Sequence, residues 1–116
     1  MSPPTINMIT RMVADFVLEA PDDWIGLWEI IKELMADGID QAELLPATLS
    51  VVQVMLARGF LAGDPPYSAG GFQLWASQDH DAIIERIRSE WLVLGRVPNI
   101  PDIVWFDQPD AASSSG

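Results

Sequence analysis

Apolar side chains recur at helical spacing in four separate segments of this chain, and a proline or a glycine follows each segment. Such a period places the apolar residues on one face of a helix, and proline and glycine are the residues that end helices. We therefore predict four helices joined by short connections. They are expected near residues 5–20 and 27–37, over residues 45–58, and from Ser77 or Asp79 to Gly95.

Two short segments of the chain have the pattern of β-strands instead. Residues 60–62 are apolar, and in residues 72–76 the apolar Phe72, Leu74 and Ala76 alternate with Gln73 and Trp75. The link between the two segments is rich in proline and glycine and too long for a tight hairpin turn. Because Trp75 is out of phase with its apolar neighbours, we expect it on the opposite side of this two-stranded hairpin, open to a partner or to the tail.

Three smaller features complete the predicted architecture. Residues 24–27 suit either a short strand or the start of the second helix, and residues 40–45 suit an added helical turn. The apolar residues 103–106 are expected to pack back on the domain as an extra strand. Residues 110–116 are small, polar and rich in serine, which predicts a disordered tail. The sequence thus predicts a single domain over residues 1–109.

This order of elements resembles a winged helix-turn-helix domain. Three helices precede a two-stranded hairpin, and a further helix follows it; residues 56–61 resemble the junction where the third helix gives way to the wing. The resemblance implies an α+β fold that is mostly α, winged-helix-like, with a C-terminal helix and a packed tail. Residues 84–91, 94–98 and 102–106 also resemble the end of small uncharacterised bacterial proteins, a similarity that implies no activity.

The chain departs from DNA-binding winged helices at the third helix. That helix usually lies in the major groove and presents cationic or amide side chains to bases and phosphates. Here residues 46–59 offer only Gln53 and Arg58, and the loop of the predicted wing carries Asp64 and no basic residue. We therefore expect no nucleic-acid binding. A winged-helix transcriptional regulator stays as the alternative, supported by element order alone.

Charge is the strongest guide to partners. The chain has 17 acidic and six basic residues, and residues 1–43 alone hold nine acids and two bases, a net charge of −7. Such a surface repels phosphate backbones and anionic membranes. We predict an acidic protein-interaction module that binds a basic protein, one form being an immunity or inhibitor protein that covers a cationic toxin acting on nucleic acid. The predicted contact residues are Asp22, Asp23, Asp37, Asp40, Glu43 and Trp75.

No group of residues has the pattern of a catalytic or metal site. Ser77, His80 and Asp81 are adjacent at the start of a predicted helix, where such residues cap the helix, whereas a catalytic triad is defined by three-dimensional geometry. The chain has one histidine and no cysteine, too few ligands for a structural zinc site. Gly70-Gly71 lacks the further glycine and lysine of a phosphate-binding loop. We expect no enzyme activity, no cofactor and no metal.

The remaining expectations concern location and assembly. The absence of cysteine suits a reducing compartment, the N-terminal stretch lacks the basic start of a secretory signal, and the uncharged run 44–57 is too short to cross a bilayer. We therefore predict a cytoplasmic protein. Exposed apolar groups on the hairpin or the tail leave a homodimer open.

Overall fold

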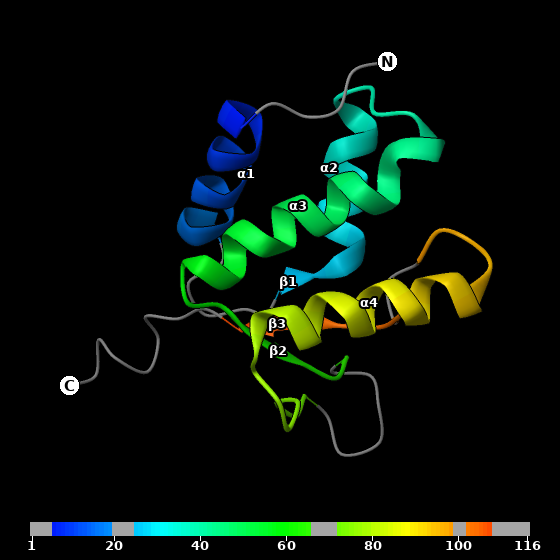
Figure 1. The fold of residues 1–116 in the computed structure, drawn as a ribbon. Coiled ribbons are helices and arrows are strands. Elements are labelled where there is room, and N and C mark those ends of the chain that lie inside the picture. Colours follow the sequence, from blue (N-terminus) through cyan, green and yellow to red (C-terminus); the bar gives the residue numbers. More distant parts are fainter. Residues whose placement is uncertain (1–5, 20–24, 66–71, 99–101, 108–116) are drawn as a thin grey trace.

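The computed structural model describes residues 6–19, 25–65, 72–98 and 102–107. Within these residues the chain is α+β and mostly helical, with four α-helices and a small antiparallel sheet (Figure 1). The helices are α1 (Ile6–Glu19), α2 (Leu27–Ala36), α3 (Leu44–Ala57) and α4 (His80–Leu94), and a 3-10 turn η1 (Gln41–Glu43) precedes α3. The strands are β1 (Ile25–Gly26), β2 (Leu61–Gly63) and β3 (Trp105–Asp107). The predicted disordered tail, residues 110–116, lies outside the described residues.

Local signals set the helix boundaries, and the four predicted helices are confirmed. The Asp79 side chain caps α4 by accepting a hydrogen bond of 3.0 Å from the backbone N–H of Ala82. Gly95 ends this helix in the left-handed conformation, with φ of 73°, which glycine adopts without steric cost. The buried side of α4 carries Ile83, Ile87 and Trp91, all members of the apolar stripe that predicted the helix.

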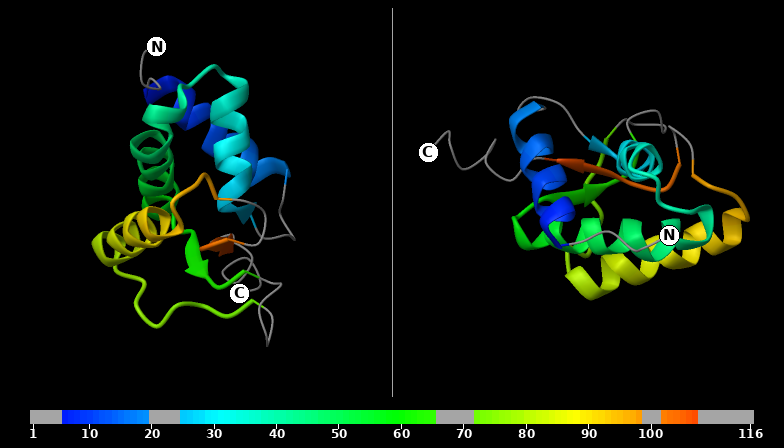
Figure 2. Two further views of the ribbon diagram at one scale, coloured as in Figure 1. Left: turned by 90° about the vertical axis from the view of Figure 1, so that its right-hand side faces the viewer. Right: turned by 90° about the horizontal axis from the view of Figure 1, so that it is seen from above.

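Helix α3 lies at the centre of the helical layer. It packs against α1, α2 and α4, as the views in Figures 1 and 2 also show. Burial on several sides leaves only a narrow exposed strip along α3, at every third or fourth residue. The exposed residues of α3 are Pro46, Ser50, Gln53 and Ala57. This strip carries no charge. Because most of its other residues are buried, α3 contributes to the core far more than to the surface.

One polar group of α3 is buried without a partner. The side chain of Thr48 is fully buried, and its Oγ1 atom has no hydrogen-bond partner among the described residues. Because a buried unsatisfied hydroxyl is destabilising, we expect Thr48→Val to raise the free energy of unfolding by about 1 kcal/mol. Urea denaturation measures this change. Thr48→Ser keeps the hydroxyl and loses a methyl group, so this control should be less stable than the native chain; a loss of stability in Thr48→Val would contradict the prediction.

The sheet differs from the predicted hairpin. Its strand order is β1-β3-β2, all antiparallel, so the C-terminal segment supplies the central strand. Phe106 lies opposite Ile25 on one side and Ala62 on the other. The prediction that residues 103–106 pack back as an extra strand is confirmed in essence. The predicted hairpin of residues 60–62 and 72–76 forms only in part, since the strand that pairs with β2 is β3 and residues 72–76 meet β2 at one antiparallel bridge.

The reason for this difference is burial. Val104 and Phe106 are fully buried and fill the space beneath the helices, whereas Gln73, Leu74 and Ala76 are exposed. Residues 72–76 instead form a single bridge on the outer edge of β2. Two backbone hydrogen bonds hold it, from Asp64 N–H to the Gln73 carbonyl at 2.8 Å and from Trp75 N–H to the Ala62 carbonyl at 3.0 Å. The more apolar segment therefore takes the central position.

Candidate functional site

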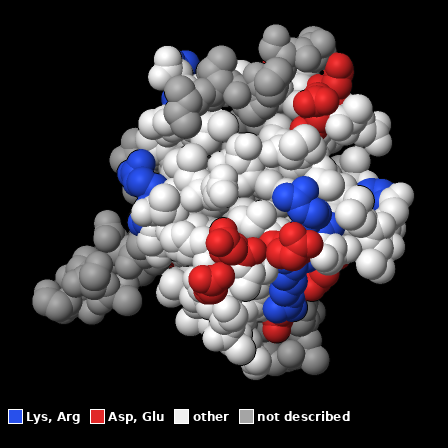
Figure 3. Space-filling view, viewed as in Figure 1, with Lys and Arg blue, Asp and Glu red and all other residues white. Residues whose placement is uncertain are grey.

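The predicted acidic contact residues fall into two groups. Asp37 and Asp40 are exposed and Glu43 is half-buried, and all three lie in the connection that follows α2. Figure 3 shows acidic side chains over the connection between α2 and α3, near the top of the view. Asp22 and Asp23 lie outside the described residues. Three of the five acidic candidates thus lie within one short stretch of the chain, residues 37–43.

Helix α2 extends this acidic stretch. Glu29, Glu33 and Asp37 are spaced four residues apart, which places them along one side of the helix and its C-terminal end. A different side of α2 carries Trp28 and Lys32, with the Lys32 Nζ atom 5.0 Å from the centre of the Trp28 ring. Residues 32–43 contain four acids and one base, so their net charge is −3.

The cations of α4 and of the segment after it lie beside carboxylates. Figure 3 shows basic and acidic side chains intermixed across the front of the molecule, where α4 lies. The pairs are Arg86 with Glu90 at 2.7 Å and with Asp64 at 3.9 Å, Arg88 with Glu85 at 3.7 Å, and Arg96 with Asp102 at 3.0 Å. Exposed pairs of this kind each stabilise a fold by only about 0–1 kcal/mol. Their main effect here is to neutralise the positive charge of this region.

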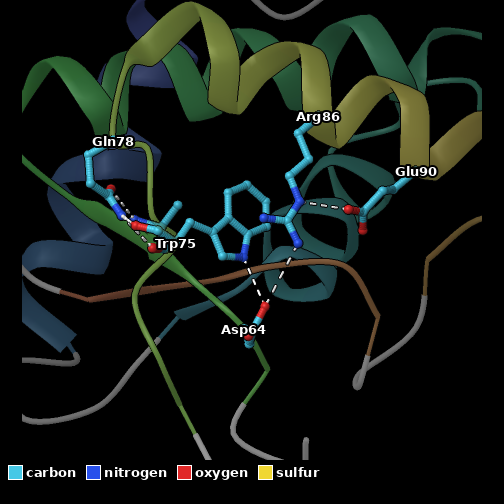
Figure 4. Close-up of polar contacts among 6 residues, drawn as sticks. Asp64, Trp75, Gln78, Arg86 and Glu90 are labelled. Atoms are coloured by element: carbon cyan, nitrogen blue, oxygen red, sulfur yellow. Dashed lines mark hydrogen bonds and ion pairs between the residues drawn. The ribbon is translucent and has the colours of Figure 1, made fainter.

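Trp75 does not lie on an open face, contrary to its predicted role as a partner contact. Its side chain is 6% exposed, and its Nε1 donates a hydrogen bond of 3.0 Å to Asp64 Oδ1. The Arg86 guanidinium lies 3.7 Å from the ring centre, so the indole is enclosed between β2 and α4 (Figure 4). As the alternation indicated, Trp75 and Leu74 face opposite sides. It is Leu74 that is exposed, because the larger indole fills the space under α4.

Gln78 completes the attachment of α4 to the sheet. Its Oε1 accepts from the Ala62 N–H at 2.9 Å, while its Nε2 donates to the Ala62 carbonyl at 2.8 Å and to the Trp75 carbonyl at 3.0 Å (Figure 4). Sequence reasoning missed this cluster, because Gln78 and Ala62 are 16 positions apart and no local pattern links them. The contacts hold the start of α4 in place, and we assign them a structural role.

A second feature missed from the sequence is an apolar surface around the C-terminal end of α4. Val93 is 88% exposed and Leu92 65% exposed on the last turn of this helix, and Met35 of α2 is 54% exposed. Figure 2, left, shows the end of α4, the segment that follows it and α2 on the side that faces the viewer. The apolar patch, as we call it, comprises Met35, Leu45, Leu92, Val93, Val97 and Ile103. A signal was present in the sequence, since Leu92 and Val93 fall outside the apolar stripe of α4.

Three shallow grooves lie within the apolar patch. One, of about 390 Å³, lies between α2 and Val97-Pro98, with Trp28, Ile31 and Met35 in its wall. A second, of about 240 Å³, is lined by Gln41 and Leu45 on one side and by Leu92, Arg96 and Val97 on the other. The third, of about 490 Å³, lies between the last turns of α4 and Ile103. The first two grooves share one lining residue, Val97.

The residues considered for catalysis lie at the start of α4, where Asp79 is the capping residue. Ser77, His80 and Asp81 are exposed at the start of α4, and the Ser77 hydroxyl accepts a hydrogen bond of 3.3 Å from the Asp79 N–H. Within the described ranges no cluster of histidine, aspartate and glutamate has the arrangement needed to hold a metal ion. A search of the same ranges finds no helix with the length and apolarity needed to cross a membrane.

Comparison with known protein families, with curated proteins and with solved structures gives no match to this chain. The resemblances drawn from the order of elements and from residues 84–106 therefore stay predictions. What the protein does must be inferred from its surface, its charge and its described contacts.

Proposed function

We propose that this protein is a non-catalytic acidic interaction module that binds a basic protein partner. The observation that carries the proposal is the exposed acidic stretch along α2 and the connection after it, where residues 32–43 have a net charge of −3. The two arginines of α4 each lie beside a carboxylate, so they do not cancel the negative charge of the acidic stretch on α2. Complementary charge accelerates encounter with a basic partner and discriminates against acidic ones.

One concrete form of this function is an immunity or inhibitor protein for a toxin that acts on nucleic acid. Such a toxin needs a cationic surface to hold phosphates. An acidic module of this size is suited to cover that surface and so prevent substrate binding. The proposal needs no catalytic residues in the module itself, and the residues that hold the partner are expected to include Asp37, Asp40 and Glu43.

The arrangement of α3 and α4 also supports a protein partner over DNA. We infer a winged-helix-like organisation in which the paired strands β2 and β3 take the place of the wing. Helix α4 lies between these two strands in the chain. In DNA-binding members the third helix enters the major groove. Here α4 packs on α3, and the exposed positions of α3 are uncharged, with Arg58 following the helix. This arrangement leaves little of α3 to read bases.

The experiment is a titration with matched charge changes. A partner is captured at low salt from the native organism, purified, and titrated calorimetrically against the native chain and two double variants. Asp37→Lys with Asp40→Lys should weaken binding by about tenfold or more, and added salt should do the same. The control, Asp15→Lys with Asp81→Lys, makes the same change in net charge at exposed sites on α1 and α4 and should have little effect.

Two results would contradict the proposed function. One is an affinity that neither salt nor the substitutions at Asp37 and Asp40 change. The other is equal weakening by both double variants, which would assign the effect to net charge and not to this acidic stretch.

A DNA-binding regulator is the second candidate, favoured by the order of elements. It predicts that the protein shifts mixed genomic duplexes in a gel at low salt, with an affinity that falls steeply as salt is added. We expect no shift. A clear shift that Arg58→Ala abolishes would replace the first proposal with this one.

A further inference from the structure

We propose that residues 72–78 act as an edge cap, which closes the outer edge of β2 and so prevents a second copy of this chain from pairing with that edge. An edge strand carries a row of unpaired backbone groups, which is a template for pairing between chains, and proteins protect such edges. The inference goes beyond the proposed function and does not depend on which partner the acidic stretch binds. Three observations carry it: how the edge is filled, what holds the edge cap, and what β2 itself lacks.

The Gln78 side chain takes the place of a neighbouring strand at the outer edge of β2. Its Oε1 accepts a hydrogen bond of 2.9 Å from the Ala62 N–H, and its Nε2 donates one of 2.8 Å to the Ala62 carbonyl (Figure 4). In an antiparallel sheet, two residues directly opposite each other exchange the same pair of bonds through their backbones. One amide side chain thus occupies the position at which a strand of another molecule would dock.

The backbone of the edge cap extends this cover along β2. The Trp75 N–H donates to the Ala62 carbonyl at 3.0 Å, and the Asp64 N–H, just beyond β2, donates to the Gln73 carbonyl at 2.8 Å. Together with the Gln78 amide, these bonds engage three backbone groups of residues 62–64. A strand from another molecule must therefore displace the edge cap before it can pair.

A buried indole holds the edge cap in place. Trp75 is 6% exposed, the Arg86 guanidinium lies 3.7 Å from the centre of its ring, and its Nε1 donates a hydrogen bond of 3.0 Å to Asp64 Oδ1. Other residues of the edge cap add little burial, since Gln73, Leu74 and Ala76 are exposed. The Trp75 ring and the Gln78 amide are therefore the two groups whose loss should open the edge.

Apart from its short length of three residues, β2 has no protection of its own. Leu61, Ala62 and Gly63 include no charged residue and no proline, the residues that commonly guard a sheet edge. Gly63 has no side chain that could hold another strand away. Asp64 is the first charged residue after β2, and its carboxylate is engaged by Trp75 Nε1. The edge cap therefore supplies the protection that the strand lacks.

The uncovered edge would suit a second copy because it is complementary to itself. Ala62 offers one donor and one acceptor toward the outer edge. When two copies meet antiparallel about a two-fold axis, the two Ala62 residues can exchange both bonds, which is the contact that Gln78 now makes within one chain. The same backbone groups are thus satisfied either within one molecule or between two.

The test compares two double variants that make the same change in composition. Trp75→Leu with Gln78→Leu removes the indole and the amide that hold the edge cap. The control, Trp91→Leu with Gln53→Leu, makes the same replacements at a buried indole of α4 and at an exposed amide of α3. Circular dichroism shows that each variant is folded. Analytical ultracentrifugation over a range of protein concentrations measures self-association, and hydrogen exchange followed by NMR measures the protection of the Ala62 N–H.

The variant with the opened edge should dimerise at protein concentrations about tenfold or more below those of the control. In dilute solution its Ala62 N–H should exchange about tenfold or more faster than in the native chain, because the bond to Gln78 is lost. This protection should return as the dimer forms. Added salt should strengthen the dimer by screening the repulsion between two copies of net charge −11, whereas it weakens binding to a basic partner, so this inference and the proposed function can fail separately.

Three results would overturn the edge cap: a folded Trp75→Leu with Gln78→Leu that dimerises no more readily than the native chain, equal dimerisation of both double variants, or a dimer in which the Ala62 N–H still exchanges rapidly. The last would place the contact elsewhere on the surface. If the double variant does not fold, Gln78→Leu alone is compared with Gln53→Leu. It should show the faster exchange at Ala62 in dilute solution and the return of protection at high concentration, and an unchanged exchange rate would equally rule the inference out.

Discussion

Replacement of Phe106 by alanine is expected to lower the free energy of unfolding by about 3–5 kcal/mol, the range for truncating a large buried side chain. Phe106 is fully buried on the central strand of the sheet and lies opposite both Ile25 and Ala62. Its loss therefore leaves a cavity that borders all three strands. Because small domains are stable by only about 5–15 kcal/mol, this loss is a large part of the total, and the variant should unfold at a much lower urea concentration than the native chain.

Urea denaturation followed by tryptophan fluorescence measures the loss. Phe72→Ala is the matched control, since Phe72 is only half-buried and lies outside the three strands. The control should lose clearly less stability. If Phe106→Ala does not fold at all, Phe106→Leu gives a smaller loss that can still be measured. Equal losses for Phe106→Ala and Phe72→Ala would mean that β3 is not the central strand.

The second large effect is expected for Gly63→Ala, which should destabilise the protein by about 1–3 kcal/mol through overpacking. A Cβ atom at Gly63 would lie 2.7 Å from Phe72 Cζ and 2.8 Å from the carbonyl oxygen of Gln73. The ring can shift, but the carbonyl belongs to the backbone that hydrogen-bonds to Asp64 and cannot move without breaking that bond. The glycine is therefore needed for the close approach of residues 72–75 to β2.

Gly95→Ala is the matched control for Gly63→Ala because its cost has a different origin. Apart from its neighbours in the chain, no atom of the described residues lies within 4 Å of a Cβ built at Gly95, but the backbone there has φ of 73°. The expected loss is about 1–2 kcal/mol from the left-handed conformation alone. Asparagine tolerates that conformation, so Gly95→Asn should recover part of the loss, whereas Gly63→Asn should be worse than Gly63→Ala. The opposite order, measured by urea denaturation, would contradict this account.

The proposed binding surface was partly accessible from the sequence. The acidic stretch after α2 was predicted because charge needs no tertiary context to be counted, and Asp37, Asp40 and Glu43 do lie in one short connection. The exposed apolar patch was not predicted. The helical spacing of apolar residues over 27–37 does not tell which of them the neighbouring elements cover, and Met35 is 54% exposed.

The sequence by itself determined the helices and their ends. Their signals are local: an apolar repeat, the Asp79 cap and the glycines that follow the helices act within a few residues of one another. The sequence likewise determined the excess of negative charge and the lack of cysteine.

Only the tertiary structure decided which segments meet. It placed β3 between β1 and β2, enclosed Trp75 beneath Arg86, and left Leu92 and Val93 uncovered. The physical reason is competition for burial. Residues 72–76 and 103–106 both have the pattern of a strand beside β2, and the backbone hydrogen bonds of such a pairing are much the same for either. The choice between them depends on how much apolar volume each brings to the space beneath the helices, and that space exists only once α1, α2, α3 and α4 have packed together.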